Sequence, residues 1–565
     1  MTLFRSLVFA SLLCSCTREP PQPADRVLRN TFVYTVDSAN PRAQAIAITN
    51  GRISYVGSDD GVRAFIGRRT EVLDLAGRMV LPGFHDTHVH PVTGGMELGE
   101  CNLNPATSLD DVRRIVRECA TRGAADDWVR GGGFQLPIFA GGKPTRQMLD
   151  SLVPERPAYL SSADGHSAWV NTRALTLAGL TRRTRDPAKG RIERDAAGAP
   201  AGTLRESAMG LVASKMPART SDDYLAGLER GLAMAAQFGI TTLHEASATE
   251  PIALAYTQAE SLGRLPARSI LSLLVNSRAD PDSEITRLSA LRARATRGKV
   301  QPVAAKIFMD GVIEAGTAAL LVPYTDRAAY RGELNLPATK FNTLVQKLDS
   351  AGFKVHVHAI GDRAIRVALD GFEQQRAKDA GSGPKHIIAH IQLFDPADIS
   401  RFAALGVVAS FQPLWAYADT YITDLTEPRL GPERSRNLYP IARVAQSGAL
   451  MAAGSDWSVS SMNPLEAMQV AVTRLGLTDS TGTAWLPDER VDLTTMIRAY
   501  TLGGAIASDH DSLAGTLAVG KAADVIVVSE DLFGLAPHRI AKARVLLTLL
   551  DGRAVYRDSA LGPVR

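Results

Sequence analysis

The sequence predicts a (β/α)8 barrel with a small β-sandwich domain formed from both chain termini. Three observations favour this fold. Short apolar strands alternate with helical stretches in the middle of the chain, hairpin signals lie near both ends, and metal-binding residue types recur where predicted strands end. The 565 residues exceed one compact domain and suit a barrel of about 250 residues with large additions.

The composition is that of a globular chain with balanced charge. Hydrophobic residues make up 45% and charged residues 22% of the sequence, enough for a large core. The net charge is +4, from 63 basic and 59 acidic residues, and no basic stripe stands out. These features argue against a nucleic-acid partner. No stretch after residue 20 resembles an apolar span of about 18 residues, so no internal transmembrane helix is expected.

The first residues resemble an export signal. Arg5 precedes an apolar run over 7–13, and the segment closes on Leu-Cys-Ser-Cys. This pattern predicts a lipoprotein signal peptide over 1–15, a lipid on Cys16 and a Pro-rich tether over 16–26. An ordinary signal peptide cleaved nearby is the alternative. The lipoprotein interpretation places the protein in the bacterial periplasm, with the outer membrane favoured and the lipid as its only membrane contact.

Besides the lipidation candidate Cys16, two cysteines, Cys101 and Cys119, follow the signal. Export to an oxidising compartment favours a disulfide between them. Two unpaired buried thiols are the alternative. The spacing does not decide, because a disulfide requires Cα atoms within about 7 Å.

Both chain ends carry β-hairpin signals. Asn50-Gly51 and Asp551-Gly552 each separate two alternating strands, and residues 515–528 form a further turn and strand. We therefore predict a β-sandwich from 27–79 and 506–565, which leaves 80–505 for the barrel.

The middle of the chain offers nine candidate strands for eight barrel positions. We assign the strand at 157–162 to an insertion over about 95–225, because the barrel pattern resumes at 239–242. The candidates are 79–84, 157–162, 240–245, 268–275, 303–309, 353–358, 386–391, 406–411 and 449–454.

Metal-binding residue types cluster at these strand ends. His88 and His90 follow the first strand, and side chains two apart on a strand share a face. Such a pair alone is weak evidence, because polar residues at a strand end often meet only water. Its position at the carboxyl end of a barrel strand strengthens it, since reactive groups gather at that face.

Three more strand ends repeat the pattern. His358 ends the strand in KVHVHAIGDRAI, His390 ends KHIIAH, and Asp456 follows the strand in LMAAGSDW. Lys306 lies inside VAAKIFMDG. Alone, Lys306 could pair with Asp310 and Asp456 could cap a loop. Recurrence at one barrel face favours a shared metal site.

The chain resembles the amidohydrolase superfamily, in the family 3 branch that includes N-substituted formamide deformylase and YtcJ-like proteins. The resemblance covers about 27–560. It rests on LPGFHDTHVHP, SADGHSAWVNTRAL, GITTLHEA, KIFMDG, VHAIGDRA, IIAHIQ, GSDW and GTLAVGKAADVIV taken together.

This resemblance implies a role for each candidate ligand. His88 and His90 match the first-strand ligands, and His358 and His390 match those of the fifth and sixth strands. Lys306 matches a lysine that becomes carboxylated and bridges two metals. Asp456 matches a ligand that also accepts a proton, which makes Lys306 and Asp456 the catalytic candidates. We expect one or two divalent ions, with zinc favoured.

Five further residues are candidates for substrate contact. His166 and Trp169 belong to the insertion and would act from a lid, although a structural role for His166 is equally favoured. His244 and Glu245 end a barrel strand. Arg363 follows the His358 strand and could bind a carboxylate or pair with Asp362.

The sequence thus predicts a metal-dependent hydrolase that cleaves an amide-type C–N bond of a small molecule, such as an N-acyl or N-formyl compound. A deaminase or a lactonase or esterase with the same metal centre is the alternative enzyme. A lipid-anchored, non-catalytic binding protein is the alternative outside the enzymes. A homodimer is left open.

Overall fold

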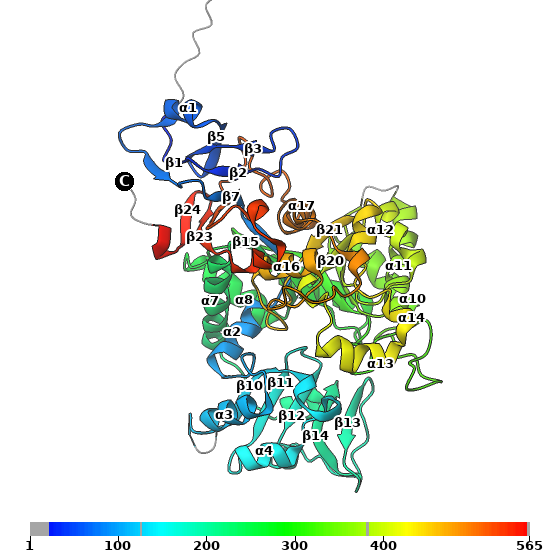
Figure 1. Ribbon diagram of the computed structural model, residues 1–565. Helices are drawn as coiled ribbons and strands as arrows, with labels where there is room; N and C mark the ends of the chain where they lie inside the picture. The colour runs from blue at the N-terminus through cyan, green and yellow to red at the C-terminus, as the bar shows by residue number, and fades with distance from the viewer. Residues whose placement is uncertain (1–21, 125–126, 380–382, 562–565) are drawn as a thin grey trace, which may run out of the picture.

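The computed structural model describes residues 22–124, 127–379 and 383–561. Three parts follow one another in space: a terminal β-domain, a central barrel and an insertion (Figure 1). The predicted signal peptide and the lipidation site Cys16 lie outside the described residues. The predicted tether overlaps the first strand, which begins at Arg26. Among the described helices, none is long and apolar enough to cross a membrane.

The central barrel is an eight-stranded parallel sheet in the order β21-β20-β19-β18-β17-β16-β15-β8. Its two edges meet because the Asp456 N–H donates to the carbonyl of His88 at 2.7 Å and the His90 N–H donates to that of Trp457 at 2.9 Å. The predicted barrel fold is confirmed. The strands are β8 (Phe84–Val89), β15 (Ile240–Ala248), β16 (Arg268–Leu274), β17 (Val300–Phe308), β18 (Lys354–Ala359), β19 (Ile387–His390), β20 (Val408–Phe411) and β21 (Leu450–Ala453).

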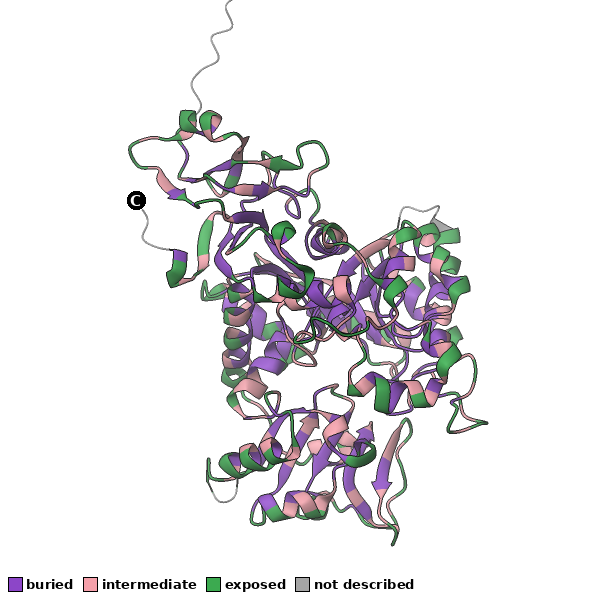
Figure 2. Cartoon of the chain, in the orientation of Figure 1, coloured by how far each residue is buried: buried purple, intermediate pink, exposed green. Residues whose placement is uncertain are grey.

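Helices surround this barrel, so its strands are buried on both faces (Figure 2). Every residue of β8, β18 and β19 is buried, and the histidines in these strands are therefore held inside the fold. The surrounding helices are α7 (Ser221–Gln237), α8 (Glu250–Ser261), α9 (Pro281–Ala295), α10 (Ala338–Ser350), α11 (Asp362–Asp379), α12 (Ile399–Leu405), α15 (Ile441–Gln446) and α16 (Pro464–Thr473). Shorter helices are α13 (Glu427–Leu430), α14 (Pro432–Ser435), α17 (Leu493–Arg498) and α18 (Gly504–Ala507), whereas α1 (Asp59–Val62) belongs to the terminal β-domain.

The terminal domain consists of two sheets with a common core that includes Ile48, Leu73, Val527 and Leu547. One sheet has the order β5-β4-β1-β6 and the other β24-β23-β22-β7-β2-β3, so the latter joins both ends of the chain. The strands are β1 (Arg26–Arg29), β2 (Phe32–Tyr34), β3 (Arg42–Ala43), β4 (Ala45–Thr49), β5 (Arg52–Gly57), β6 (Glu71–Asp74), β7 (Met79–Pro82), β22 (Val525–Val528), β23 (Val545–Leu550) and β24 (Arg553–Arg557).

Both predicted hairpin turns are present in this domain. Asn50 and Gly51 have φ values of 50° and 76°, and Asp551 and Gly552 have values of 48° and 72°. Two successive residues with positive φ form a type I′ turn, which matches the twist of the flanking strands. The turns connect β4 with β5 and β23 with β24.

The candidate strand at 79–84 is corrected by the structure. Residues Met79–Pro82 form β7, which pairs with β2 and β22 in the terminal domain. The first barrel strand is β8, which begins at Phe84. Only Gly83 separates the two strands, and an apolar pattern does not reveal that the chain changes sheets. A Cβ at Gly83 would lie 2.2 Å from the Thr241 hydroxyl oxygen, so the crossing has no room for a side chain.

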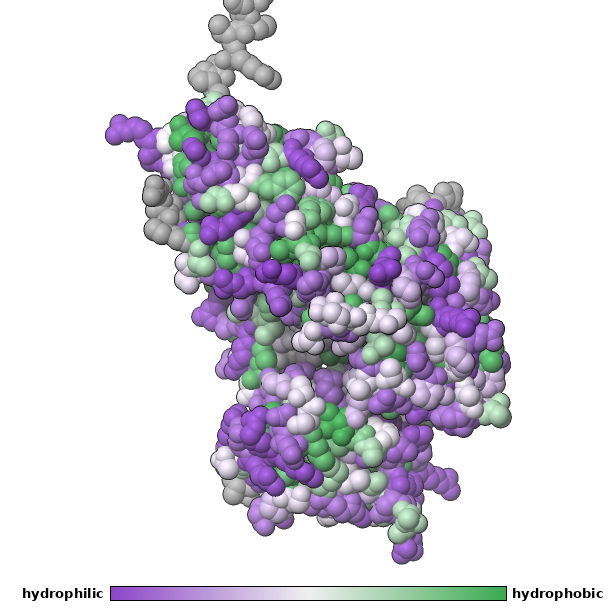
Figure 3. Space-filling view, in the orientation of Figure 1, coloured by the Kyte–Doolittle hydropathy of each residue, from purple (hydrophilic) through white to green (hydrophobic). Residues whose placement is uncertain are grey.

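The insertion has a six-stranded sheet in the order β13-β14-β12-β11-β10-β9. The candidate strand at 157–162 lies in this sheet as β11. Cys101 and Cys119 form a disulfide with a Cα–Cα distance of 5.5 Å, which ties β9 to α3. Figure 3 shows a hollow between the insertion and the barrel. α2 (Pro91–Gly99) packs against barrel helix α7 and leads into the insertion (Figure 1). The elements of the insertion are β9 (Cys101–Asn102), α3 (Leu109–Ala120), β10 (Val129–Phe134), α4 (Arg146–Leu152), β11 (Ala158–Ser162), β12 (Ser167–Val170), α5 (Thr172–Leu177), β13 (Gly190–Arg194), β14 (Pro200–Glu206) and α6 (Met209–Ala213).

Candidate metal centre

The structure brings the six candidate ligands together at the carboxyl end of the barrel. Asp456 lies at the centre of this cluster. Its Oδ1 is 3.1 Å from His90 Nε2 and 3.6 Å from His88 Nε2, and its Oδ2 is 3.7 Å from His390 Nδ1. The His358 ring lies 4.4 Å from the His390 ring, measured between centroids. Lys306 Nζ completes the cluster at 3.3 Å from His88 Nε2.

This cluster has the properties of a metal site. One ligand atom from each of His88, His390 and Asp456 lies within 4.8 Å of the other two. Asp456 Oδ1 is buried and makes no well-aligned hydrogen bond within the described residues. Its nearest charged neighbour is the His90 ring at 3.1 Å, and a bound cation would compensate the buried carboxylate more directly. Imidazole and carboxylate are ligands that zinc favours.

The protonation of the histidines also suits metal binding. Burial, with the positive charge of Lys306 as a further cause, holds the pKa of His88 and His390 well below the ordinary value. Burial does the same for His358. These rings are therefore neutral and offer a lone pair. Burial alone would lower the pKa of His90, but Asp456 and Glu245 raise it to about 9, so His90 must lose a proton when it binds metal.

Hydrogen bonds select which nitrogen each histidine offers. His358 Nε2 donates to the Gly311 carbonyl at 3.1 Å, and this leaves Nδ1 as the lone-pair nitrogen. His390 Nδ1 donates to Gln412 Oε1 at 3.0 Å, and its ring stacks on Trp415. Such outer partners fix the tautomer and the orientation of a ligand.

His88 is held by a buried chain of three further side chains. His88 Nδ1 is 3.0 Å from His356 Nε2, and His356 Nδ1 is 2.8 Å from Ser272 Oγ. The same hydroxyl lies 2.7 Å from His244 Nε2. The sequence analysis did not single out His356, and it missed this contact with His88. Period-two alternation along β18 could have indicated it, because His356 and His358 share the inward face.

We expect His356→Phe to weaken metal binding by about 10- to 100-fold, because His88 loses the partner that orients its ring. Chelator competition measures the affinity, and circular dichroism tests whether the fold is intact. His356→Gln should recover part of the loss, since an amide can still hydrogen-bond to His88. His510→Phe, a buried histidine outside the barrel, serves as the control. Unchanged metal affinity in a folded His356→Phe protein would contradict the orienting role.

The backbone at two candidate ligands is strained. His390 and Asp456 have φ values of 76° and 54°, a region that non-glycine residues enter at a cost of about 1–3 kcal/mol each. Asp86 holds the backbone next to Asp456 in place, because its Oδ1 accepts hydrogen bonds from the backbone N–H groups of His88 and Ser455 at 3.1 and 3.0 Å. Burial raises the pKa of Asp86 to about 7. Sequence reasoning missed this residue, although it stands inside the HDTHVH motif.

Comparison with known proteins identifies the family. A family model described as "Amidohydrolase family" matches residues 71–556. The chain belongs to the amidohydrolase family. This result confirms the resemblance inferred from the motifs, and the protein is a metal-dependent hydrolase of the amidohydrolase superfamily.

Three curated relatives of this amidohydrolase align along nearly its whole length. Protein LONG AFTER FAR-RED 3 from Arabidopsis thaliana is 30% identical and covers 97% of this chain and 94% of its own. Putative amidohydrolase YtcJ from Bacillus subtilis is 29% identical and covers 94% and 98%. N-substituted formamide deformylase from Arthrobacter pascens is 28% identical and covers 95% and 99%.

A solved structure shares the fold. An uncharacterized metal-dependent hydrolase from Pyrococcus horikoshii superposes with a TM-score of 0.71 at 24% identity. The alignment covers 91% of this chain and 99% of that one. The likeness therefore extends over the barrel of this amidohydrolase and most of its additional parts.

The insertion of this amidohydrolase places one side chain beside the candidate metal centre. His166 lies between β11 and β12, and its ring is 5.5 Å from the His358 ring. Its Nδ1 is 3.0 Å from Glu206 Oε2, and Glu206 Oε1 accepts from the Thr317 hydroxyl at 2.7 Å. Burial alone would lower the pKa of His166, but the Glu206 carboxylate raises it to about 9. The structure thus holds a cationic imidazole beside the cluster.

Trp169 and His244 lie away from the position predicted for substrate contacts. Trp169 is fully buried, and its Nε1 donates to the Thr145 carbonyl at 2.7 Å, so it belongs to the core of the insertion. His244 is fully buried and bonds to Ser272. The predicted strand ended at residue 245, but β15 continues to Ala248. His244 therefore lies inside the strand and not at its end.

Glu245 and Arg363 support other parts of the structure. Glu245 is buried, and its Oε1 lies 3.3 Å from His90 Nδ1, so it orients a candidate ligand. Arg363 donates from its guanidinium to the Gly332 carbonyl at 3.2 Å. Its backbone N–H donates a hydrogen bond to Asp362 Oδ1, and its guanidinium forms no ion pair with that carboxylate. The structure therefore places Arg363 against the loop that follows β17.

Proposed function

We propose that this amidohydrolase cleaves an amide-type C–N bond of a small molecule, using one or two divalent ions, with zinc favoured. The observation that carries the proposal is the convergence of three histidine rings on Asp456, with Lys306 and His358 beside them. The relative from Arthrobacter pascens is named an N-substituted formamide deformylase, which supports an N-formyl or N-acyl substrate.

A divalent ion bound here would supply the Lewis acidity that activates water and polarises a carbonyl oxygen. Asp456 would accept the proton of the attacking water at a carboxylate oxygen and pass it to the leaving nitrogen. His166 would donate a hydrogen bond toward the oxygen that becomes negative, because it is cationic and oriented by Glu206.

Lys306 is proposed to carry a carboxylate when metal is bound. Its side chain is fully buried, and burial lowers its pKa to about 7, so a large fraction is neutral amine near neutral pH. A neutral amine adds carbon dioxide and releases one proton to give a carbamate. This change replaces a cation that repels metal with an anion that has two ligand oxygens.

We further propose that the protein is exported to an oxidising compartment as a lipoprotein. The Cys101–Cys119 disulfide supports export, since disulfides persist in the periplasm and are rare in the cytosol. The membrane anchor depends on Cys16 and is testable by mass spectrometry of the purified membrane fraction.

Metal removal tests the hydrolase proposal. We expect chelator-treated protein to lose hydrolysis of N-formyl and N-acyl amides down to background, and zinc to restore it, because the protonated side chains of the cluster cannot replace a divalent ion as a Lewis acid. The measurement is amine release from a panel of amides, with a parallel panel of esters, lactones and aminated heterocycles. Hydrolysis confined to the second panel would overturn the amide assignment. Inertness of metal-replete protein on both panels would overturn the catalytic one.

A further inference from the structure

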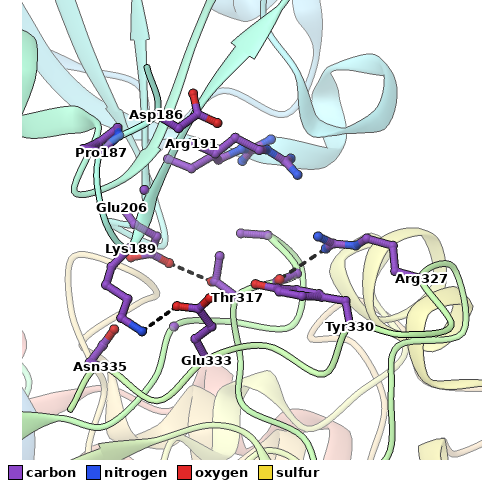
Figure 4. A pocket seen from close by; sticks show the side chains of 15 residues that line it. Asp186, Pro187, Lys189, Arg191, Glu206, Thr317, Arg327, Tyr330, Glu333 and Asn335 are labelled. Carbon is purple, nitrogen blue, oxygen red and sulfur yellow. Dashed lines mark hydrogen bonds and ion pairs between the residues drawn. The ribbon is translucent and has the colours of Figure 1, made fainter. Parts of the chain in front are cut away.

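A second recess lies beside the metal centre, between the insertion and the loop that follows β17. It is a cavity of about 320 Å³, with β13 and β14 on one side and residues 311–335 on the other (Figure 4). This volume lies at the lower end of the range of small-molecule sites. The cavity can therefore hold part of a small organic molecule.

The cavity shares two residues with the surroundings of the metal centre. Glu206 lines the cavity and pairs with His166, whose ring faces His358. Gly311 also lines the cavity, and its carbonyl contacts His358 Nε2 at 3.1 Å. One or two residues thus separate an occupant of the cavity from the candidate ligand His358.

The three carboxylates of the cavity wall already have partners. Glu206 accepts from His166 and Thr317. Glu333 accepts from the Lys189 ammonium at 2.5 Å, a contact that joins the barrel loop to the insertion. Asp186 lies 3.5 Å from the Arg194 guanidinium and also accepts from the Ile192 N–H. The charge of Arg205 also contributes to lowering the pKa of Glu206, but none of the three carboxylates forms an ion pair with Arg191 or Arg327 in the described part of the chain.

The arginines outnumber the remaining carboxylates. Arg191 and Arg205 both lie against one carboxylate, that of Glu193, which Lys143 also approaches at 3.6 Å. Arg327 makes no ion pair with a carboxylate in the described part of the chain, and its guanidinium lies 4.5 Å from the centroid of the Tyr330 ring. Two arginines and Lys143 thus share the Glu193 carboxylate, Arg327 pairs with none in the described part of the chain, and the cavity carries surplus positive charge.

Arg191 and Arg327 extend from opposite walls of the cavity (Figure 4). Both lie near enough to Tyr330 for their charges to oppose the rise in its pKa that burial causes. A planar guanidinium donates two parallel hydrogen bonds to a carboxylate, and two such groups around one cavity favour an anion.

We propose that this cavity binds a carboxylate of the substrate through Arg191 and Arg327, so that the preferred substrate is an amide with an acidic far end. This inference rests on the proposed hydrolase function. The carboxylate would be held by the guanidinium groups, the flat face of Tyr330 would contact the adjoining part of the molecule, and the amide would reach the cluster past Glu206 and Gly311.

Paired substrates test the proposal. N-formyl and N-acetyl amino acids are compared with the corresponding amino acid amides, which have the same shape without the negative charge. We expect the wild-type enzyme to prefer the acids. Arg327→Gln and Arg191→Gln should each raise KM for the acids by about 10- to 100-fold, leave kcat nearly unchanged and hardly alter KM for the amides. Arg327→Lys should recover part of the loss, and Arg264→Gln on the outer barrel surface is the matched control.

Binding of N-acetylglycine to the metal-free protein, measured by calorimetry, separates this proposal from the hydrolase function. If the protein binds this probe, the arginine variants lose it and the metal-loaded enzyme hydrolyses no amide, the cavity assignment stands and the hydrolase proposal fails. If acids and amides are hydrolysed equally well and the variants change neither, the cavity assignment is overturned and the hydrolase proposal stands.

Discussion

Asp456→Asn is expected to lower kcat for amide hydrolysis by about 10³- to 10⁴-fold, the upper part of the range for loss of a general acid–base group. The amide has nearly the shape of the carboxylate but accepts no proton at neutral pH. It also removes the negative charge that lies 3.1 Å from His90 and 3.6 Å from His88. The measurement is kcat of metal-loaded protein, with metal content determined by elemental analysis.

Asp110→Asn, at an exposed aspartate in the first turn of α3, is the control for the same chemical change. Thermal melting would show whether Asp456→Asn retains the fold, which we expect because Asp456 Oδ1 makes no well-aligned hydrogen bond within the described residues. A folded, metal-containing Asp456→Asn enzyme with kcat within about tenfold of the wild type would contradict the proton-transfer role.

The barrel could be predicted from the sequence because each strand is a short apolar run that is buried on both faces. The candidate ligands could be found for the same reason. A histidine at the end of such a buried run, as His358 and His390 are, is directed toward the carboxyl end of the barrel. Strand order alone then brings His88 and His390 to the same barrel end, although 302 positions separate them in the numbering.

The outer partners of the ligands could not be predicted in this way. The contact between His88 and His356 joins residues 268 positions apart, and the Gln412 contact with His390 depends on how β20 continues beyond its end. Neither leaves a periodic signal. His244 was misplaced because β15 continues to Ala248, beyond the predicted end of the strand.

Trp169 was misplaced for a different reason. Its closeness to His166 in sequence suggested a common role, but β12 directs it into the core of the insertion, where its ring lies near Phe134 and Phe139. Two residues that are close in sequence can thus point in different directions: His166 lies beside His358, and Trp169 lies in the core of the insertion. The same limit applies to Gly83, where one residue separates strands of two different sheets.

Lys306→Ala is expected to reduce both metal occupancy and activity, with activity falling on the order of 10²-fold or more. The variant removes the proposed carbamate, and with it two ligand oxygens near His88. In the wild type, bicarbonate should increase zinc uptake by chelator-treated protein. Because burial lowers the pKa of Lys306 to about 7, the amine is mostly protonated and unreactive below pH 7 and mostly neutral above it. Uptake should therefore rise from pH 6 to pH 8 and then level off.

The decisive measurement is zinc stoichiometry by elemental analysis after reconstitution with and without bicarbonate. Lys215→Ala, on the surface of the insertion, is the control and should behave as the wild type. Lys306→Ala should lose the bicarbonate effect, and a short carboxylic acid such as formate should restore part of the zinc uptake by filling the space that the side chain leaves. A Lys306→Ala protein with the wild-type number of ions and near-normal turnover would show that the amine makes no contribution to metal binding. The buried cation beside His88 would then require a different physical explanation.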